Sequence, residues 1–415
     1  MKRLTGPSER AAGPAGLTGP AAPPPAGGGR LAALDGLRGL AALAVVLYHF
    51  LARFGEAHWG VSLYPHGDVS ARFPALLQFG RFGVYLFFAI SGFVILMTLE
   101  RCSGLVDFAV RRAARLWPAM LVCATLSTLV LNGSGVTTHY PGWERFAVTP
   151  LEYLSSLVFL PPDMVGGALG LGGDPRWVEG VYWTLWAEIR FYALVAVVFL
   201  LAGRHFVLAW LAVQLASAGL ETVRMIDPGL ATAQFKLALV LQPQNLCWFS
   251  MGMAAYLWRR GRPGAVPLAV LALYAIAAKD LVAWQEGGLV LHPGRAATYA
   301  AVLAIVAAVA GRVPMRPLAS APLVAVGLAS YPLYLFHQGP GMVGFMYAER
   351  AGIAPWAAFA LVFAAVVGVA LLLHRLVERP GQRWLTGLGR RGLMRLEARW
   401  PALRFGGGAR FGAAA

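Results

Sequence analysis

Apolar segments of about membrane-spanning length alternate with shorter polar segments from residue 31 almost to the C-terminus. A helix needs about 20 predominantly apolar residues to cross the hydrocarbon core of a bilayer. The pattern predicts ten such spans, at residues 32–52, 81–99, 116–132, 181–202, 205–220, 244–258, 264–278, 296–311, 322–338 and 355–376. We therefore expect an all-α integral membrane protein built as a bundle of about ten transmembrane helices.

Basic residues are concentrated in alternate connections between these spans. If the N-terminus is cytoplasmic, the inner connections carry the arginines of 101–115, 259–262 and 312–316, together with Arg204 and the basic C-terminal segment. The outer connections are mixed in charge or hold most of the acidic residues. Cytoplasmic loops carry an excess of Lys and Arg, so the pattern predicts that both termini are cytoplasmic. The predicted location is the plasma (inner) membrane, with multiple passes.

Composition agrees with a membrane protein and excludes other classes. Hydrophobic residues make up 58% of the chain and charged residues only 13%, whereas soluble domains are about one-quarter charged. The formal net charge of +16 does not indicate a nucleic-acid partner, because the arginines lie in short loops between spans, where topology explains them. Three cysteines, with no CxxC pair, support neither a disulfide framework nor a zinc site, and no metal is expected.

Three regions follow from this organisation. Residues 1–30 are rich in Pro, Gly and Ala and are predicted to be a disordered cytoplasmic tail. Residues 31–380 form the transmembrane domain, and residues 381–415 a basic cytoplasmic tail. The long outer loop 133–180 contains an apolar run at 152–160 that is too short to cross; it is expected to lie in the interface or to re-enter the membrane. The role of this loop is left open by the sequence.

Ionisable residues inside the spans are candidates for function, because such groups are costly in lipid and usually face a bundle interior or a wet cavity. Arg38 and His49 lie eleven positions apart in the first span, about three helical turns or 16 Å along the axis, and point the same way. Asp35 lies three residues before Arg38, on nearly the same face, and is expected to hold that arginine in place. Glu188 lies inside an aromatic-rich span.

Further motifs lie at span ends. Arg112 and Arg115 stand three apart at the inner edge of the third span, in the sequence RRAARLWP. The ninth span ends as SYPLYLFH on His337, and the last closes with VERP. By depth, His49, Glu188 and His337 are predicted to gather in the outer half of the membrane, with the arginines in the inner half. A structural alternative stays open, in which Arg112 and Arg115 only set the topology.

These motifs, in this order, resemble acyltransferase family 3, a group of membrane-bound O-acyltransferases that modify sugars, peptidoglycan, lipopolysaccharide and some antibiotics. The resemblance runs from about residue 31 to 385 and rests on four features. These are the DGLRG…H pattern ending at His49, the RxxR of Arg112 and Arg115, the W-T-L-x-x-E-x-x-F-Y match at 183–192, and the YPLYLFH and ERP endings. It implies an enzyme that takes its acyl donor from inside the cell and its acceptor from outside.

Each residue type suits a step of that reaction. Arg38, Arg112 and Arg115 are expected to bind the phosphates of acyl-CoA, because guanidinium groups pair well with phosphate oxygens. His49 is expected to take the proton of the acceptor hydroxyl as a general base. Glu188 would orient the imidazolium, balance its charge or share the base role. The remaining candidates, with acceptor or supporting roles, are His337, Trp183, Tyr192 and Asp35. For Trp183 and Tyr192 a packing role in the interfacial belt competes with this.

The expected reaction moves an acetyl or other short acyl group from cytosolic acyl-CoA to a hydroxyl. The expected acceptors are a glycan, a lipid-linked sugar or a glycosylated small molecule. No cofactor is expected to stay bound; acyl-CoA, most simply acetyl-CoA, is the co-substrate, and membrane lipids are the other partners. The alternative is a proton-coupled transporter or exporter that uses the intramembrane His and Glu, although no inverted repeat is visible. Direct transfer and a covalent acyl-histidine both remain open.

Overall fold

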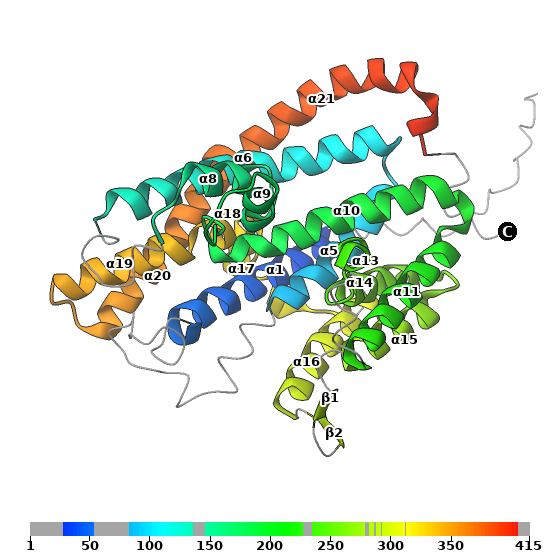
Figure 1. Cartoon of the computed structure of the whole chain (residues 1–415), viewed down its shortest axis with the longest axis horizontal. Coiled ribbons are helices and arrows are strands. Elements are labelled where there is room, and N and C mark those ends of the chain that lie inside the picture. The colour runs from blue at the N-terminus through cyan, green and yellow to red at the C-terminus, as the bar shows by residue number, and fades with distance from the viewer. Residues whose placement is uncertain are drawn as a thin grey trace, which may run out of the picture.

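The computed structural model describes residues 28–53, 83–135, 146–226, 235–278, 282–285, 288–291, 293–311 and 313–405. These residues are almost entirely helical (Figure 1). The helices of the N-terminal half are α1 (Gly28–Tyr48), followed by the π-helical turn η1 (His49–Arg53), α5 (Gly83–Leu99), α6 (Leu105–Gly133), α8 (Pro150–Leu157), α9 (Pro162–Ala168), η3 (Gly180–Tyr182), α10 (Trp183–Ala202), η4 (Gly203–His205) and α11 (Phe206–Ile226).

The C-terminal half contains a second set of helices and one small hairpin. The helices are α13 (Phe235–Leu241), α14 (Leu246–Arg259), α15 (Ala265–Ile276), α16 (Pro293–Ala310), η6 (Arg316–Ala319), α17 (Ala321–Leu328), α18 (Ser330–Phe336), α19 (Gln338–Arg350), α20 (Pro355–Leu373), η7 (His374–Glu378), α21 (Arg379–Arg399) and η8 (Pro401–Leu403). The strands are β1 (Val282–Gln285) and β2 (Gly288–Leu291).

Each of the ten apolar segments predicted from the sequence contains helix. Four helical stretches are long and apolar enough to cross a membrane: Ala32–Leu51, Leu105–Gly133, Gly180–Val223, which covers both α10 and α11, and Pro355–Gly389. Shorter apolar helices occupy Gly83–Leu99, Ala265–Ile276 and Tyr299–Ala310. The prediction of a helical membrane protein is therefore confirmed, while the count of ten spans and the side of the termini remain predictions.

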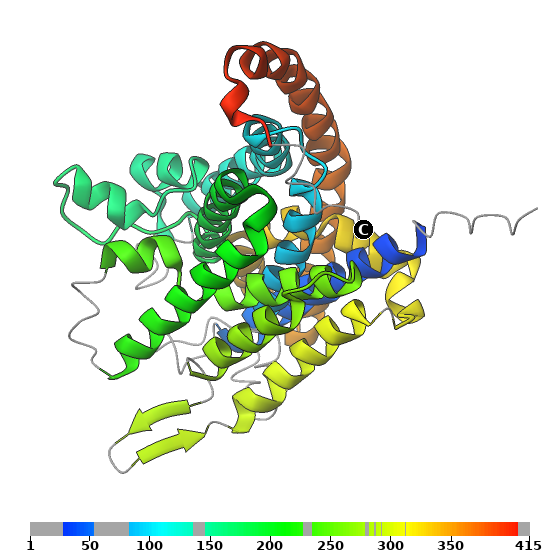
Figure 2. The same ribbon diagram turned by 90° about the vertical axis from the view of Figure 1, so that its right-hand side faces the viewer.

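The hairpin β1–β2 is the exception to the predicted all-α fold. Its strands are antiparallel, with Val282 opposite Leu291 and Gln285 opposite Gly288. Both views show it projecting from the bundle beside α16 (Figures 1 and 2). It lies in a segment that the hydropathy pattern assigns to a connection, and hydropathy does not distinguish a short hairpin from an irregular loop.

Two predicted elements differ in their extent. The third span was predicted to begin at residue 116, but α6 begins at Leu105 and continues through Pro118, so Arg112 and Arg115 lie well inside a helix. The ninth span is divided into α17 and α18 at Ala329, and His337 separates α18 from α19. Irregular backbone at membrane depth occurs where it is buried in protein or lines a cavity. The interruptions at Ala329 and His337 therefore point to a cavity near α18.

The tail regions also gain detail. The predicted N-terminal tail lies outside the described residues up to position 27. Within the predicted C-terminal tail, α21 is a helix that runs alongside α6 (Figure 1). Gly381 lies against Pro118 and Gly389 against Val110, which allows the two helices to approach closely. The apolar run at 152–160 begins as α8, whose first turn is held by a capping box between Thr149 and Glu152.

The centre of the bundle depends on close backbone contacts at glycines. A Cβ atom on Gly252 of α14 would collide with the carbonyl oxygen of Ala89 on α5, and a Cβ on Gly92 of α5 would collide with that of Phe249 on α14. Gly327 of α17 meets the backbone of α1 at Asp35 in the same manner. Small residues at such crossings let membrane helices approach closely enough for van der Waals packing. This packing is important in the bilayer, because the hydrophobic effect does not drive helices together there.

We predict that Gly252→Ala destabilises the protein. The added methyl group has no space, so α5 and α14 must separate, at a cost of about 1–3 kcal/mol. Gly219→Ala on α11 is the matched control, because a Cβ there meets nothing within 4 Å. That control should be neutral or slightly stabilising, since alanine is favoured over glycine inside helices by roughly 0.5–1 kcal/mol. Thermal unfolding in detergent measures both; equal unfolding temperatures for the two variants would contradict the close crossing.

Candidate active site

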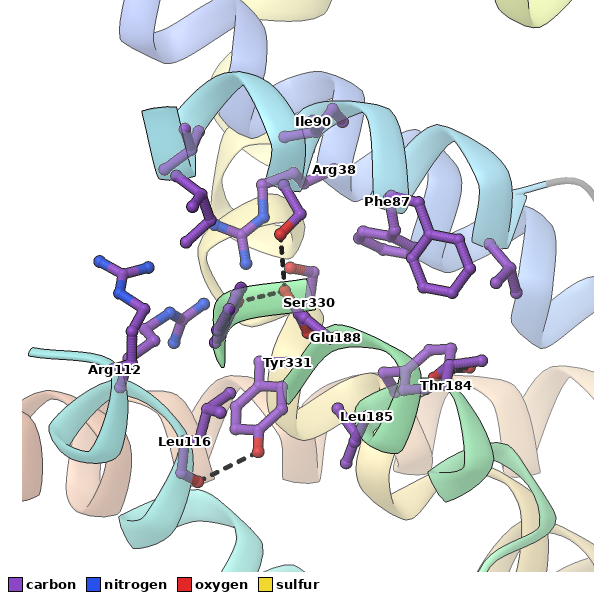
Figure 3. A pocket seen from close by; sticks show the side chains of 18 residues that line it. Arg38, Phe87, Ile90, Arg112, Leu116, Thr184, Leu185, Glu188, Ser330 and Tyr331 are labelled. Carbon is purple, nitrogen blue, oxygen red and sulfur yellow. Dashed lines mark hydrogen bonds between the residues drawn. The ribbon is translucent and has the colours of Figure 1, made fainter. Parts of the chain in front are cut away.

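A cavity of about 220 Å³ lies between α1, α5, α6, α10 and α18. Its charged lining comes from three different helices: Arg38 of α1, Arg112 and Arg115 of α6, and Glu188 of α10. Figure 3 shows Arg38 and Arg112 toward one end of this cavity and Phe87 and Thr184 toward the other. We call it the arginine cavity. The structure thus brings Arg38 together with Arg112 and Arg115, which lie 74 and 77 residues further along the chain and which the sequence also singled out.

The two α6 arginines are held differently. Arg115 forms an ion pair with Glu378, whose side chain is 1% exposed, and its guanidinium lies 5.3 Å from the ring centroid of Tyr331. Glu378 also binds Nδ1 of His374 at 2.6 Å. Arg112 lies over the rings of Phe108 and Tyr192, and within the described part of the chain its buried Nε has no hydrogen-bond partner. Such an orphaned donor in a cavity suits an anionic or carbonyl ligand.

Glu188 lies in the arginine cavity, where it accepts hydrogen bonds from Ser91 Oγ at 2.8 Å and from the Tyr192 hydroxyl. The sequence placed it beside His49; the structure places it among the arginines, because α10 turns this face toward α5 and α6. Tyr192 belongs to the same cavity. Asp35 interacts electrostatically with Arg38, yet the two form no ion pair in the part of the chain that the structure describes.

His49 and His337 contact each other directly. Nδ1 of His49 lies 3.0 Å from Nε2 of His337, with ring centroids 5.0 Å apart. His49 begins the π-helical turn after α1, and His337 is the fully buried residue between α18 and α19. We call them the histidine pair. The sequence placed both at one depth and gave His337 a supporting role; their contact spans 288 positions of sequence.

The hydrogen bonds assign the protons of this pair. Nδ1 of His337 lies 3.1 Å from the carbonyl oxygen of Leu333 and 3.0 Å from that of Tyr334. Carbonyl oxygens only accept, so this Nδ1 carries the hydrogen, and Nε2 of a neutral His337 must accept from Nδ1–H of His49. Nε2 of His49 therefore holds the lone pair. His337 fixes the tautomer in which His49 can take a proton through Nε2.

Helix α18 connects the arginine cavity to the histidine pair. Ser330, Tyr331 and Tyr334 line the cavity, and Oγ of Ser330 is buried with no hydrogen-bond partner among the described residues. Tyr334 bonds Thr184 Oγ1 at 2.9 Å through its hydroxyl, and its ring centroid lies 6.1 Å from that of His337. The end of the cavity marked by Thr184 and Phe87 is thus the end nearest the histidines (Figure 3).

Other candidate positions are less central. Trp183, the first residue of α10, is 46% exposed and does not line the arginine cavity, as expected for an interfacial aromatic. All three cysteines are buried free thiols; burial raises the pKa of Cys102 to about 12, so it stays protonated. Among the described residues, no three His, Cys, Asp or Glu side chains come together in a group that could hold a metal ion.

Comparison with known proteins decides the family. The model of the family described as "Acyltransferase domain" matches residues 31–375, most of the chain. The chain belongs to acyltransferase family 3. As a family member with membrane-spanning helices, it is a membrane acyltransferase, which confirms the enzyme class expected from the motifs.

Named relatives extend across the family 3 domain. The chain is 27% identical to acyltransferase MdmB of Streptomyces mycarofaciens over 86% of its own length and 92% of that protein. It is 26% identical to an O-acetyl transferase of Shigella phage Sf6 over 59% of its own length and 68% of the relative. The 32% identity to nodulation protein 10 of Rhizobium leguminosarum bv. viciae covers 28% of this chain and only 32% of that relative. No solved structure matches the chain.

Two carboxylates in this family 3 domain were missed by sequence reasoning. Glu179 is fully buried and accepts hydrogen bonds from Ser127 Oγ at 2.6 Å and from the backbone N–H of Gly339 at 2.8 Å. It therefore ties the segment after His337 to α6. Glu179 lies at the end of a loop that was assigned no role, directly before the aromatic span. Glu378 was visible in VERP, but its pairing with Arg115 requires knowledge of how α6 and η7 pack.

Glu179 gives the family 3 domain a predictable pH dependence. Burial raises the pKa of Glu179 from 4.5 to about 7, against the lowering effect of its two hydrogen bonds. Between those values the folded protein holds a proton that the unfolded chain releases, so the free energy of unfolding falls as the pH rises from about 4.5 to 7, by up to about 3 kcal/mol. Thermal unfolding of wild type and Glu179→Gln across this range should show the slope only in wild type. Parallel curves would contradict the buried carboxyl.

Proposed function

We propose that this enzyme transfers an acetyl or other short acyl group from cytosolic acyl-CoA to a hydroxyl of a sugar-containing acceptor at the outer face of the plasma membrane. The acceptor classes are a glycan, a lipid-linked sugar or a glycosylated metabolite. The observation that carries the proposal is that α18 lines the arginine cavity with Ser330, Tyr331 and Tyr334 and is followed directly by His337 of the histidine pair. The name of the phage relative, O-acetyl transferase, supports transfer to oxygen.

Donor binding is assigned to the arginine cavity. Three guanidinium groups in one small cavity are a suitable receptor for an anionic donor, because arginine forms charge-assisted, bidentate bonds with phosphate oxygens. Arg112 Nε and Ser330 Oγ are buried polar atoms without partners in the described structure, as a site built for a polar ligand requires. With a volume of about 220 Å³, the cavity is large enough for the thioester arm of the donor but not for a whole CoA molecule. The phosphates of CoA would lie at the end of the cavity that is marked by Arg112. The positive-inside pattern supports a cytoplasmic orientation of that end.

Transfer itself is assigned to His49. Nε2 of His49 takes the proton of the acceptor hydroxyl while the hydroxyl oxygen attacks the thioester carbonyl carbon. The carbon–sulfur bond then breaks, the CoA thiolate leaves, and it takes the proton from His49. His337 accepts the hydrogen of Nδ1 of His49, which leaves the lone pair on Nε2 to act as the base. Glu188 balances part of the positive charge of the arginines. This lowers the cost of burying the guanidinium groups when the donor is absent.

The test is acyl transfer by the full-length protein in lipid nanodiscs. Acetyl-CoA is supplied with a panel of glycosides, free thiol is measured as it forms, and acetylated product is identified by mass spectrometry. We expect thiol release that depends on the acceptor, with one acetyl group on oxygen for each thiol formed. Failure of the protein to bind acetyl-CoA, or binding without transfer to any hydroxyl, would overturn the proposal.

A further inference from the structure

A second cavity, of about 390 Å³, shares no lining residue with the arginine cavity. It is lined by residues 146–148 and 174–180, by Glu152, Pro162 and Asp163, by Leu131 of α6 and by the first turns of α19. We call it the acceptor cavity. Its volume falls within the range of about 300–1,000 Å³ that is usual for small-molecule sites.

Part of the lining of this cavity lies next to the histidine pair along the chain. Gln338 and Gly339 line it, and they follow His337 in the chain. Leu131 and Met342 line it as well, and both belong to the buried cluster that contains Phe50, the residue after His49. The acceptor cavity is therefore bordered by residues adjacent in the chain to His337 and by residues packed in the same cluster as Phe50, and it shares no lining residue with the arginine cavity.

Two side chains of the lining suit a sugar ring. Trp177 is partly buried and presents an aromatic surface, on which the apolar face of a pyranose packs. Oε1 of Gln338 is buried and has no hydrogen-bond partner within the described residues. The approach of this amide is permitted by Gly180, because a Cβ there would lie 3.1 Å from Oε1. An unpaired buried amide oxygen is costly, and a ligand hydroxyl would satisfy it.

The charge of the lining disfavours anions. Glu152, Asp163 and Asp174 contribute carboxylates to it, and the fourth carboxyl group, that of Glu179, adds less negative charge because burial raises its pKa to about 7. Arg176 is the basic residue among the described lining side chains, and its guanidinium is already paired with Asp174 at 2.8 Å. Like charges in a partly enclosed site raise the cost of binding a carboxylate or a phosphate.

We propose that the acceptor cavity binds the hydroxyl-bearing substrate, and that it takes a sugar ring that is neutral or carries an amine rather than an anionic sugar. This rests on the proposed function, which it deepens by placing the acceptor and restricting its charge. The ring packs on Trp177, one hydroxyl donates to Gln338, and a second hydroxyl reaches Nε2 of His49.

The experiment uses the full-length protein in nanodiscs with acetyl-CoA and three probes: methyl glucoside, methyl glucosaminide and methyl glucuronide. Wild type is expected to acetylate the first two and to show kcat/KM at least about 10-fold lower for the glucuronide. Trp177→Leu and Gln338→Leu are expected to raise the KM for the glucoside by about 10-fold while the KM for acetyl-CoA stays within about twofold. Trp384→Leu, at an exposed tryptophan of α21, is the matched control and should keep both constants.

The outcomes separate this proposal from the one it rests on. If wild type transfers acetyl groups to glycosides but the Trp177 and Gln338 variants keep the wild-type KM for the glucoside, the acceptor cavity is wrong and the proposed function stands. Preference for the glucuronide would overturn the charge rule. If wild type turns over none of the three probes while it acetylates a hydroxyl of another class, the sugar assignment falls. If wild type does not bind acetyl-CoA, the proposed function itself falls.

Discussion

His49→Ala is expected to lower the rate of acyl transfer by about 10²- to 10⁴-fold, the range that a positioned general base contributes. The variant loses the lone pair at Nε2, whereas the arginine cavity keeps its lining, because His49 is not among the residues that form it. Acetyl-CoA should therefore bind with nearly its wild-type affinity. Thiol release measures the first effect, and titration of the purified variant with CoA measures the second.

Two substitutions at His337 serve as controls for this interpretation. His337→Gln retains an oxygen that can accept from Nδ1–H of His49, whereas His337→Leu offers no acceptor. If the tautomer argument is right, the Gln variant keeps more activity than the Leu variant, and the pH profile of the Leu variant changes shape as His49 loses its fixed tautomer. A His49→Ala protein with normal turnover would eliminate His49 as the base, whatever the His337 variants show.

Arg112→Gln is expected to raise the KM for acyl-CoA by about 10- to 100-fold, because one charge-assisted contact is worth roughly 1.5–3 kcal/mol. The KM for the acceptor should change little. Arg112 is the informative position of the two in α6, since its guanidinium packs on aromatic rings and its Nε is an unused donor among the described contacts. Initial rates with each substrate varied in turn give both constants.

Arg115→Ala should also weaken binding of acyl-CoA more than binding of the acceptor, but with an added loss of stability. The substitution leaves the carboxylate of Glu378 buried beside His374 without its main counter-charge, and breaking such a pair costs about 3–5 kcal/mol. Arg111→Gln is the matched control, because Arg111 pairs with Asp107 and does not line the cavity. Equal weakening by all three variants would indicate a general charge effect instead of a donor site.

Hydropathy and motif spacing predicted the helical segments well, since each apolar run is one helix or a pair of helices. They also singled out Arg38, Arg112 and Arg115, which the structure gathers into one cavity. Depth along the bilayer normal can be read from span direction, and this placed His49 and His337 together. The rotation of a helix about its axis cannot be read in this way when nearly every face is apolar, which is why the sequence did not predict that Glu188 lines one cavity with the three arginines.

The acceptor cavity lay beyond what the sequence could indicate. Residues 152–180 lack a long apolar run, and their arrangement is set by local features such as the capping box at Thr149 and by the bonds of Glu179 to two distant segments. Gln338 lines the cavity because α18 ends just before His337 and α19 begins at Gln338. The contacts of Glu179 with Ser127 and Gly339 join positions 52 and 160 residues apart, and hydropathy along a single sequence carries no signal for such contacts.

The ion pair between Arg115 and Glu378 has a consequence for biogenesis. The ribosome delivers α6 well before η7, so during insertion the guanidinium of Arg115 has no carboxylate partner until η7 has been synthesised. A chain interrupted before residue 378 would present an uncompensated cation inside the bundle and would be a substrate for membrane quality control. Neutralisation of Arg115 thus has to await the synthesis of a segment far downstream.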